Sequence, residues 1–303
     1  SGVISGAGAL SKAGSGKITL SGKNAYTGTT AISSGKLTVT GSLADTTAVT
    51  VASGATFGLN SSAGGATIGG LRGAGKVDLA GQKLTVNIAD AAELTTFSGI
   101  IEGATSASSL TKSGDGTLKL SGTNTFEGPV SVDNGVLEIS NLSALGASGA
   151  STNGTSVNRD AALYIVGGSG FELSEKLILG SGGSVGEARI RLVSGNVTLT
   201  KPIALFGDSA IEALSGELLL DNTSSSVGSK MIAIDSSCGL FQTCNFRVGG
   251  NGLSGGGLVK TFLDKDNAVN SDGIDLGGED LIVNNNGAFR ISGASTVSYT
   301  HLR

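Results

Sequence analysis

The sequence is poor in the residues that most enzymes and metal sites use. It has one histidine, two cysteines, two prolines and no tryptophan among 303 residues, and charged residues make up 15% of it. Average proteins carry roughly 25% charged residues. Two prolines and no Gly-X-Y period exclude collagen. The net charge of −4 and the lack of lysine or arginine runs argue against nucleic acid and anionic membrane surfaces as partners.

The scarcity of histidine leaves little room for catalysis. The single histidine, His301, lies near the end of the chain, and a Ser-His-Asp or Cys-His arrangement would depend on it. We expect a frayed tail over 296–303 instead. Residues 250–255 fit G-x-G-x-x-G, but no helix is expected after them, as a dinucleotide fingerprint requires. We therefore expect corner glycines there, and no catalytic residue, cofactor or metal.

The two cysteines, Cys238 and Cys244, lie close together in the sequence. A disulfide between them is the favoured interpretation, and it requires Cα atoms within about 7 Å. A metal pair would lack further ligands, and a redox pair usually has C-x-x-C spacing. Free thiols are the next alternative. A disulfide would favour an oxidising compartment.

Acidic residues gather once, in the segment 264–280. We expect a solvated loop with a charged rim. A calcium site and a carboxylate pair for glycoside cleavage stay open as alternatives, although the spacing follows neither an EF-hand nor a calcium-binding nonapeptide repeat. The residues are Asp264, Asp266, Asp272, Asp275, Glu279 and Asp280.

Glycine and short apolar runs are abundant, with 51 glycines and 39% hydrophobic residues. Runs such as "GKITLSG" and "GTLKLSG" alternate apolar with polar residues, which predicts short strands with one face inward. Glycine, asparagine and serine close each run and suit sharp corners. Helical periodicity is almost absent, and 89–97 is the one tempting helix. No apolar stretch approaches the roughly 18 residues of a membrane helix.

One segment of the chain occurs twice. Residues 10–39 and 110–139 align without a gap, with 11 of 30 positions identical, and a weaker echo lies at 255–261. The repeated residues that we expect to define the architecture are Leu10, Lys12, Gly14, Gly16, Leu20, Gly22, Asn24, Tyr26, Gly28 and Gly35, with Leu110, Lys112, Gly114, Gly116, Leu120, Gly122, Asn124, Phe126, Gly128 and Gly135.

Side-chain roles within the repeats follow from their residue types. Asn24 and Asn124 are expected in turns, bonded to neighbouring backbone or stacked on another asparagine. Tyr26 and Phe126 are expected to pack over a corner, with a ligand platform as the less favoured alternative. The lysines of the repeats are expected to point outward and discourage sideways strand pairing. They are Lys12, Lys17, Lys36, Lys112 and Lys119.

Strands of this length cannot bury a face alone and must stack on equivalents. We therefore predict an all-β fold, a right-handed single-stranded parallel β-helix with about 20 residues per rung. One continuous β-helix is expected over 1–303, with repeats at 1–40 and 97–140 and more degenerate rungs over 141–295. The first residues lack a basic and an apolar region, so no signal peptide is expected.

The stretches "SGVISGAGALSKAGSGKITLSGKNAYTGTTAISSGKLTV" and "FSGIIEGATSASSLTKSGDGTLKLSGTNTFEGPVSVDNGVLEI" resemble the passenger-associated transport repeat of bacterial autotransporters. Residues 68–87 resemble the spacer between such repeats, and 160–220 resemble degenerate passenger β-helix more loosely. The resemblance implies a cell-surface or secreted passenger, exported by type V secretion through an outer-membrane β-barrel translocator in the full-length chain. The sequence departs from the family in lacking the C-terminal β-barrel and a signal peptide, so we expect it to be an internal fragment of a longer passenger.

The expected function is therefore a non-catalytic stalk or adhesin segment, with binding on loops that interrupt the rungs. The expected loops are 141–160 and 221–247, and the expected partners are a host cell, a glycan or a second copy. Two alternatives remain: a β-helical polysaccharide lyase or hydrolase, and a calcium-stabilised extracellular binding module.

Overall fold

A computed structural model describes most of the first two thirds of the chain and isolated segments after that. The described residues are 2–60, 65–147, 154–168, 170–182, 186–201, 203–205, 209–214 and the strands β27 to β35 given below. The described elements are all strands, and every described pairing between them is parallel. The predicted all-β parallel solenoid is confirmed.

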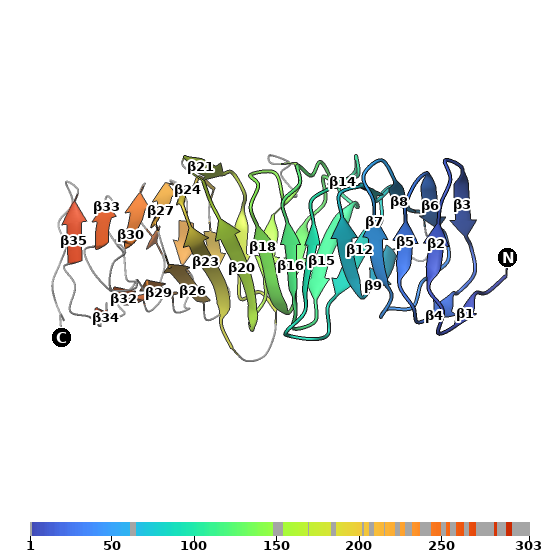
Figure 1. Ribbon diagram of the computed structural model, residues 1–303. Helices are drawn as coiled ribbons and strands as arrows, with labels where there is room; N and C mark the ends of the chain where they lie inside the picture. Colours follow the sequence, from blue (N-terminus) through green and yellow to red (C-terminus); the bar gives the residue numbers. More distant parts are fainter. Residues whose placement is uncertain are drawn as a thin grey trace. The chain divides into compact units, whose positions relative to one another are not determined.

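The chain divides into two compact units, 1–153 and 154–303. In unit 1 the strands follow one another as successive turns (Figure 1) and form three main sheets. Sheet 1 contains β2 (Leu10–Lys12), β5 (Thr30–Ile32), β7 (Ala48–Val51), β10 (Gly70–Gly73), β13 (Leu94–Phe97), β16 (Thr117–Leu120) and β18 (Gly135–Ile139). Sheet 2 contains β3 (Lys17–Leu20), β6 (Lys36–Val39), β8 (Thr56–Leu59), β11 (Lys76–Asp78) and β14 (Ile100–Glu102). Sheet 3 contains β9 (Gly65–Ile68), β12 (Lys83–Asn87), β15 (Ser109–Ser113) and β17 (Val130–Val132), and β1 (Ser5–Gly6) pairs with β4 (Ala25–Tyr26).

Each turn of unit 1 places a strand in register on the strand of the turn before it. Within the first repeat, Lys17 pairs with Lys36. Between the repeats, Lys83 pairs with Ser109, which is a longer step along the chain. The predicted rung length therefore lies at the short end of the observed range, and some turns between the repeats carry longer corners.

The core of unit 1 consists of apolar columns that run from rung to rung. One such column joins Leu37 to Phe57, Phe57 to Val77 and Val77 to Ile101. All four side chains are fully buried. The alternation of apolar and polar residues predicted these inward positions, because successive side chains of a strand point to opposite faces.

The segment 89–97 does not form a helix. Its last four residues, Leu94–Phe97, are strand β13, and the residues before them form a turn in which Glu93 N donates to Asp90 O at 2.9 Å. Thr95 and Phe97 are buried while Leu94 and Thr96 are exposed. A strand accounts for this pattern, because only an extended backbone turns every second side chain toward the core.

Unit 2 repeats the same architecture with three ladders of parallel strands. The first contains β20 (Ala161–Val166), β23 (Ala188–Ser194), β26 (Ser209–Ala213), β29 (Ile232–Ser236), β32 (Val259–Leu263) and β34 (Ile282–Val283). The second contains β19 (Thr155–Val157), β22 (Leu177–Leu179), β25 (Ile203–Leu205), β28 (Ser225–Val227) and β31 (Leu253–Ser254). The third contains β21 (Phe171–Leu173), β24 (Asn196–Leu199), β27 (Gly216–Asp221) and β30 (Cys244–Gly249), and β33 (Asn267–Asn270) pairs with β35 (Phe289–Ser292).

The two segments expected as binding loops are not loops throughout. Residues 141–160 include strand β19, and 221–247 include β28, β29 and the start of β30. In the first segment, 141–147 form the turns that follow β18. One continuous β-helix over the whole chain stays a prediction, and the tail 296–303 lies outside the described residues.

Candidate functional site: the buried clamps of the repeats

Two of the five repeat lysines point inward, which corrects the expectation that all five point outward. Lys12 and Lys112 are 2% and 0% exposed. Lys112 lies in register between Val86 and Val132, which are core positions. The spacing contained the signal, because Lys12 is two positions from Leu10 and therefore shares its face of the strand.

The buried ammonium groups bind backbone carbonyls at the corners. Lys112 Nζ donates to Ser113 O at 2.8 Å, Gly114 O at 2.6 Å and Asn134 O at 3.2 Å. Lys12 Nζ makes the same set of bonds, to Ala13 O at 3.0 Å, Gly14 O at 2.6 Å and Ser34 O at 3.0 Å. Each lysine thus holds its own corner and the corner of the next rung, and we call this arrangement the lysine clamp.

Burial and charge oppose each other at Lys112. Burial lowers the pKa of its ammonium to about 8, and the charge of Asp115 opposes that change. At neutral pH the group is therefore still protonated and has three N–H donors for three carbonyl oxygens. Because each donor is used, the buried charge is hydrogen-bonded rather than isolated, which is the condition for its tolerance.

Glycine makes the second corner of each clamp. Gly35 and Gly135 have φ angles of +69° and +64°, a region that other residues enter only with strain. A Cβ on Gly135 would also lie 2.5 Å from the carbonyl oxygens of Gly114 and Gly116 on the preceding rung. Any side chain here would separate the two corners that the lysine joins.

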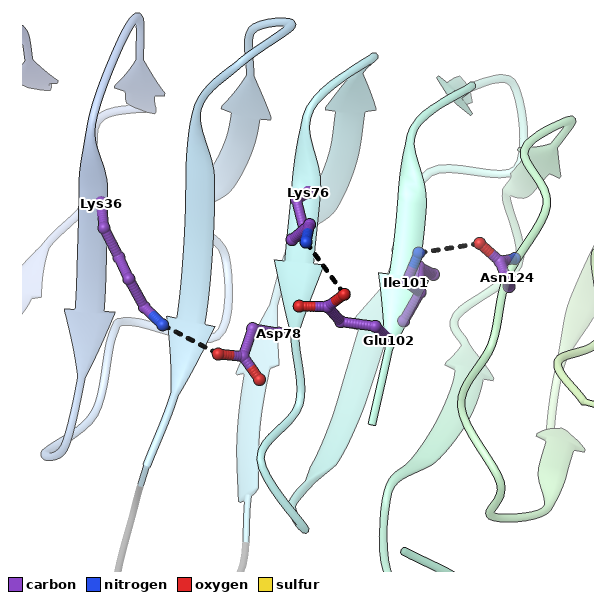
Figure 2. Close-up of polar contacts among 6 residues, drawn as sticks. All are labelled: Lys36, Lys76, Asp78, Ile101, Glu102 and Asn124. Atoms are coloured by element: carbon purple, nitrogen blue, oxygen red, sulfur yellow. Dashed lines mark hydrogen bonds and ion pairs between the residues drawn. The ribbon is translucent and has the colours of Figure 1, made fainter. Parts of the chain in front are cut away.

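The repeat asparagines tie three successive rungs together. Asn124 Oδ1 accepts from Ile101 N at 2.8 Å on the preceding rung (Figure 2), and its Nδ2 donates to Ala144 O at 2.6 Å on the following one. Asn24 does the same, with Ile4 N at 3.1 Å and Ser42 O at 3.1 Å. Both asparagines bond to backbone, and we call this arrangement the asparagine clamp.

The repeat aromatic residues are core residues. Tyr26 is 1% exposed and Phe126 fully buried. The Tyr26 hydroxyl is 2.6 Å from the Thr30 hydroxyl, so its polar end has a partner. Neither ring is accessible to a ligand, which excludes them as a binding platform.

The other three repeat lysines lie on outer faces, and they are Lys17, Lys36 and Lys119. Ion pairs on these faces join strands of different rungs. Lys36 reaches across β8 to Asp78 at 2.8 Å, and Lys76 pairs with Glu102 at 3.0 Å (Figure 2). Gly58 lies between the first pair, and a Cβ there would meet Lys36 Cε at 2.8 Å. Lys119 pairs with Glu138 at 2.6 Å. The pairs of Lys76 and Lys119 join neighbouring rungs, and that of Lys36 spans two steps of the ladder. All three are partly exposed and have the modest strength of surface ion pairs.

The described residues contain no group of three or more His, Cys, Asp and Glu that would hold a metal ion. Within the same residues, no apolar helix of membrane-spanning length occurs. Cys238, His301 and the acidic side chains of 264–280 lie outside the described side chains, as does Lys260 of the weak third echo. The disulfide and calcium interpretations therefore stay predictions.

Both repeats match a known protein family. The Passenger-associated-transport-repeat family matches residues 10–39 and 110–139. The chain is 29% identical over 214 residues to the adhesin BmaC autotransporter of Brucella suis biovar 1 (strain 1330), which covers 69% of this chain and 6% of that protein. The chain therefore spans a small part of the length of that relative. No solved structure matches it significantly.

The boundaries of the matched family coincide with the clamps. Each matched segment begins in the strand that carries the clamp lysine and ends with the strand at the positive-φ glycine. The similarity indicates a cell-surface or extracellular location tied to the outer membrane.

Proposed function

We propose that this chain is a non-catalytic, adhesive segment of a cell-surface passenger, because it carries two passenger-associated transport repeats and resembles an autotransporter adhesin. Its rungs form a stiff stalk, and its exposed turns contact a host cell or another surface partner. The relative's own name is the source of the adhesive role, and the structure of the repeats supports the role of a stalk.

The proposal rests mainly on one observation: the buried polar side chains of the repeats bond to backbone groups of neighbouring rungs. The clamp lysines and asparagines are buried and bond only to backbone in the contacts described above. Polar groups that are fully committed to backbone rigidify a fold and leave no free group for chemistry. The repeats therefore hold rungs together, which is what a stalk requires.

Adhesion is assigned to the turns because the core-facing residues are inaccessible. The turn at 141–147 follows the second repeat and exposes the apolar side chain of Leu142, which is 47% exposed. Its backbone is fixed by Asn124 through Ala144 O at 2.6 Å. An exposed turn whose backbone is held by a rigid core is suited to contact a partner, because binding residues often lie on loops that a rigid scaffold positions.

The absence of a catalytic role belongs to the proposal as well. The sequence has one histidine, and within the described residues the strongly perturbed groups Lys112 and Glu175 are buried and bonded to protein. Active-site groups whose pKa is strongly shifted usually face a cleft. Groups that face packed backbone instead fit a structural role.

The test is binding of the fluorescently labelled chain to an epithelial cell monolayer, with a polysaccharide panel incubated in parallel. We expect saturable cell binding that weakens in Leu142→Ser, while the surface variant Thr50→Ser binds like the parent. No new reducing or unsaturated ends are expected from the panel. Absence of saturable binding would contradict the adhesive role. Release of reducing or unsaturated sugar ends would show that the chain cleaves polysaccharides.

A further inference from the structure

Each repeat pairs with itself. In the first, Leu10 pairs with Thr30 and Lys17 with Lys36. All four strands involved, β2, β5, β3 and β6, lie within residues 10–39. In the second repeat, β15 pairs with β17 and β16 with β18, again within a single copy. A repeat is therefore two stacked layers of the solenoid and not a single rung.

The lysine clamp is also complete within one repeat. The three acceptors of Lys12 lie at residues 13, 14 and 34, and those of Lys112 at 113, 114 and 134. The lysine binds both layers, so its bonds form as soon as the two corners meet. None of these bonds requires a residue outside the repeat.

The rungs between the repeats lack this closure in the part of the chain that the structure describes. Val86 occupies the place of the clamp lysine in the rung before Lys112, and an apolar side chain cannot join two corners by hydrogen bonds. Strands β10 and β13 are registered only through Gly73 and Phe97, but β12 and β15 share five registered pairs, so the intervening layers differ from the repeats by the missing clamp and not by the number of pairs. The chain from Gly73 to Phe97 is also longer than the step within either repeat.

The two repeats occupy different sheets. The clamp-lysine strand of the first, β2, is in sheet 1, while that of the second, β15, is in sheet 3. The strand after the corner is in sheet 2 in the first repeat and in sheet 1 in the second. What both copies share is therefore the clamped pair of layers and not a position around the solenoid.

We propose that each repeat is an independent closure unit of the solenoid, which stays closed when the rungs between the repeats open. In a solenoid, each rung contacts only its neighbours, so local stability varies along the chain. The longer chain between Gly73 and Phe97 changes the loop entropy little, since that entropy grows only with the logarithm of loop length. The clamps therefore decide which layers stay closed longest.

Native-state hydrogen exchange on the full chain tests this directly. Ser33 N and Asp133 N donate at 2.8 Å to the carbonyls of the two clamp lysines, while Ser98 N and Ile100 N, outside the matched segments 10–39 and 110–139, donate at 2.9 and 3.0 Å. The bonds are closely matched in length. We expect the first two amides to exchange at least about 10-fold more slowly than the second two. Equal rates, or faster exchange in the repeats, would overturn the proposal.

A matched pair of variants separates the clamp from general stability. In Lys112→Met, exchange across 110–139 is expected to rise to the rate of the intervening rungs, while 10–39 keeps its protection. Lys119→Met, which removes a partly exposed ion pair with Glu138 from the same repeat, is expected to speed exchange there by no more than about 5-fold and to leave 10–39 unchanged. Uniform acceleration along the chain in Lys112→Met would contradict independent closure. If that variant does not fold, the comparison of amides in the parent chain still decides the question.

Discussion

Lys112 and Asn134 are 22 residues apart in the chain, and the buried ammonium of the first donates to the backbone carbonyl of the second at 3.2 Å. The equivalent bond joins Lys12 to Ser34 at 3.0 Å. The residue type at the acceptor position differs between the copies, serine in one and asparagine in the other. The bond is the same in both, because the lysine binds the backbone carbonyl and not the side chain. This relationship identifies the clamp as the feature that the repeated sequence preserves.

The asparagine clamp gives the first prediction. Asn124→Ala removes the partners of Ile101 N and Ala144 O, both on buried backbone. Leaving such groups unsatisfied costs about 1–3 kcal/mol. We expect a loss of about 2 kcal/mol in the free energy of unfolding, measured by urea denaturation. Thr123→Ala, at the exposed neighbouring position, serves as the control, and an equal loss in both variants would refute the role of Asn124.

Thr95 gives a prediction of the opposite sign. Its side chain is fully buried, and its Oγ1 has no partner among the described residues. It is flanked in the core column by Leu118. Thr95→Val keeps the shape and removes a desolvated hydroxyl, so we expect stabilisation of about 1 kcal/mol. Thermal denaturation measures it, and a lower melting temperature would show that the hydroxyl has a stabilising contact.

Some features of the fold and of the clamps can be predicted from the sequence, and others cannot. The strands, the glycine corners and the repeat follow from alternation and from residues such as Gly35 and Gly135, because these are local constraints. The inward direction of Lys12 does not follow from residue type, although Leu10 sets the face, because a charge normally argues for an outward position. A buried lysine becomes plausible only when three carbonyls are seen to converge on it, and corner geometry determines that.

Other features depend on stacking order, which no local pattern specifies. Lys36 pairs with Asp78 across an intervening strand, because Gly58 leaves the space between them open. The occupation of different sheets by the two repeats depends on the summed length of the rungs between them. Neither could be obtained from residues 10–39 alone.

The ion pair of Lys36 and Asp78 gives a third prediction. Both side chains are partly exposed, at 38% and 27%. A double-mutant cycle with Lys36→Met and Asp78→Asn should therefore give a coupling of only about 0.5 kcal/mol. Raising salt to about 1 M should reduce it, since the Debye length falls to about 3 Å. A coupling that persists unchanged in high salt would contradict a solvent-screened pair.

In unit 2, Glu175 predicts a dependence of stability on pH. Burial raises the pKa of its carboxyl from 4.5 to about 7, and the hydrogen bond from Thr155 opposes this. The folded state therefore binds the proton more tightly than the unfolded state. The stabilisation is complete below about pH 4.5 and is lost as the pH rises through about 7, by up to about 3 kcal/mol.

Glu175→Gln removes this titration. Compared with the parent, the variant should lose less stability between pH 5 and pH 8 in urea denaturation. Other groups titrate alike in both proteins, so the difference between the two slopes isolates Glu175. Parallel stability profiles would show that the carboxyl has a normal pKa.

The central claim is that buried lysines clamp both repeats, and unfolding free energies of matched lysine variants test it most directly. Lys12→Met and Lys112→Met each remove three charge-assisted hydrogen bonds and also relieve the burial of a charge, for a net loss of about 2 kcal/mol. Lys17→Met and Lys119→Met, on outer faces of the same repeats, should change stability by no more than about 0.5–1 kcal/mol. Clear losses in the first pair and small changes in the second are the predicted result; four equally small changes would contradict the clamp.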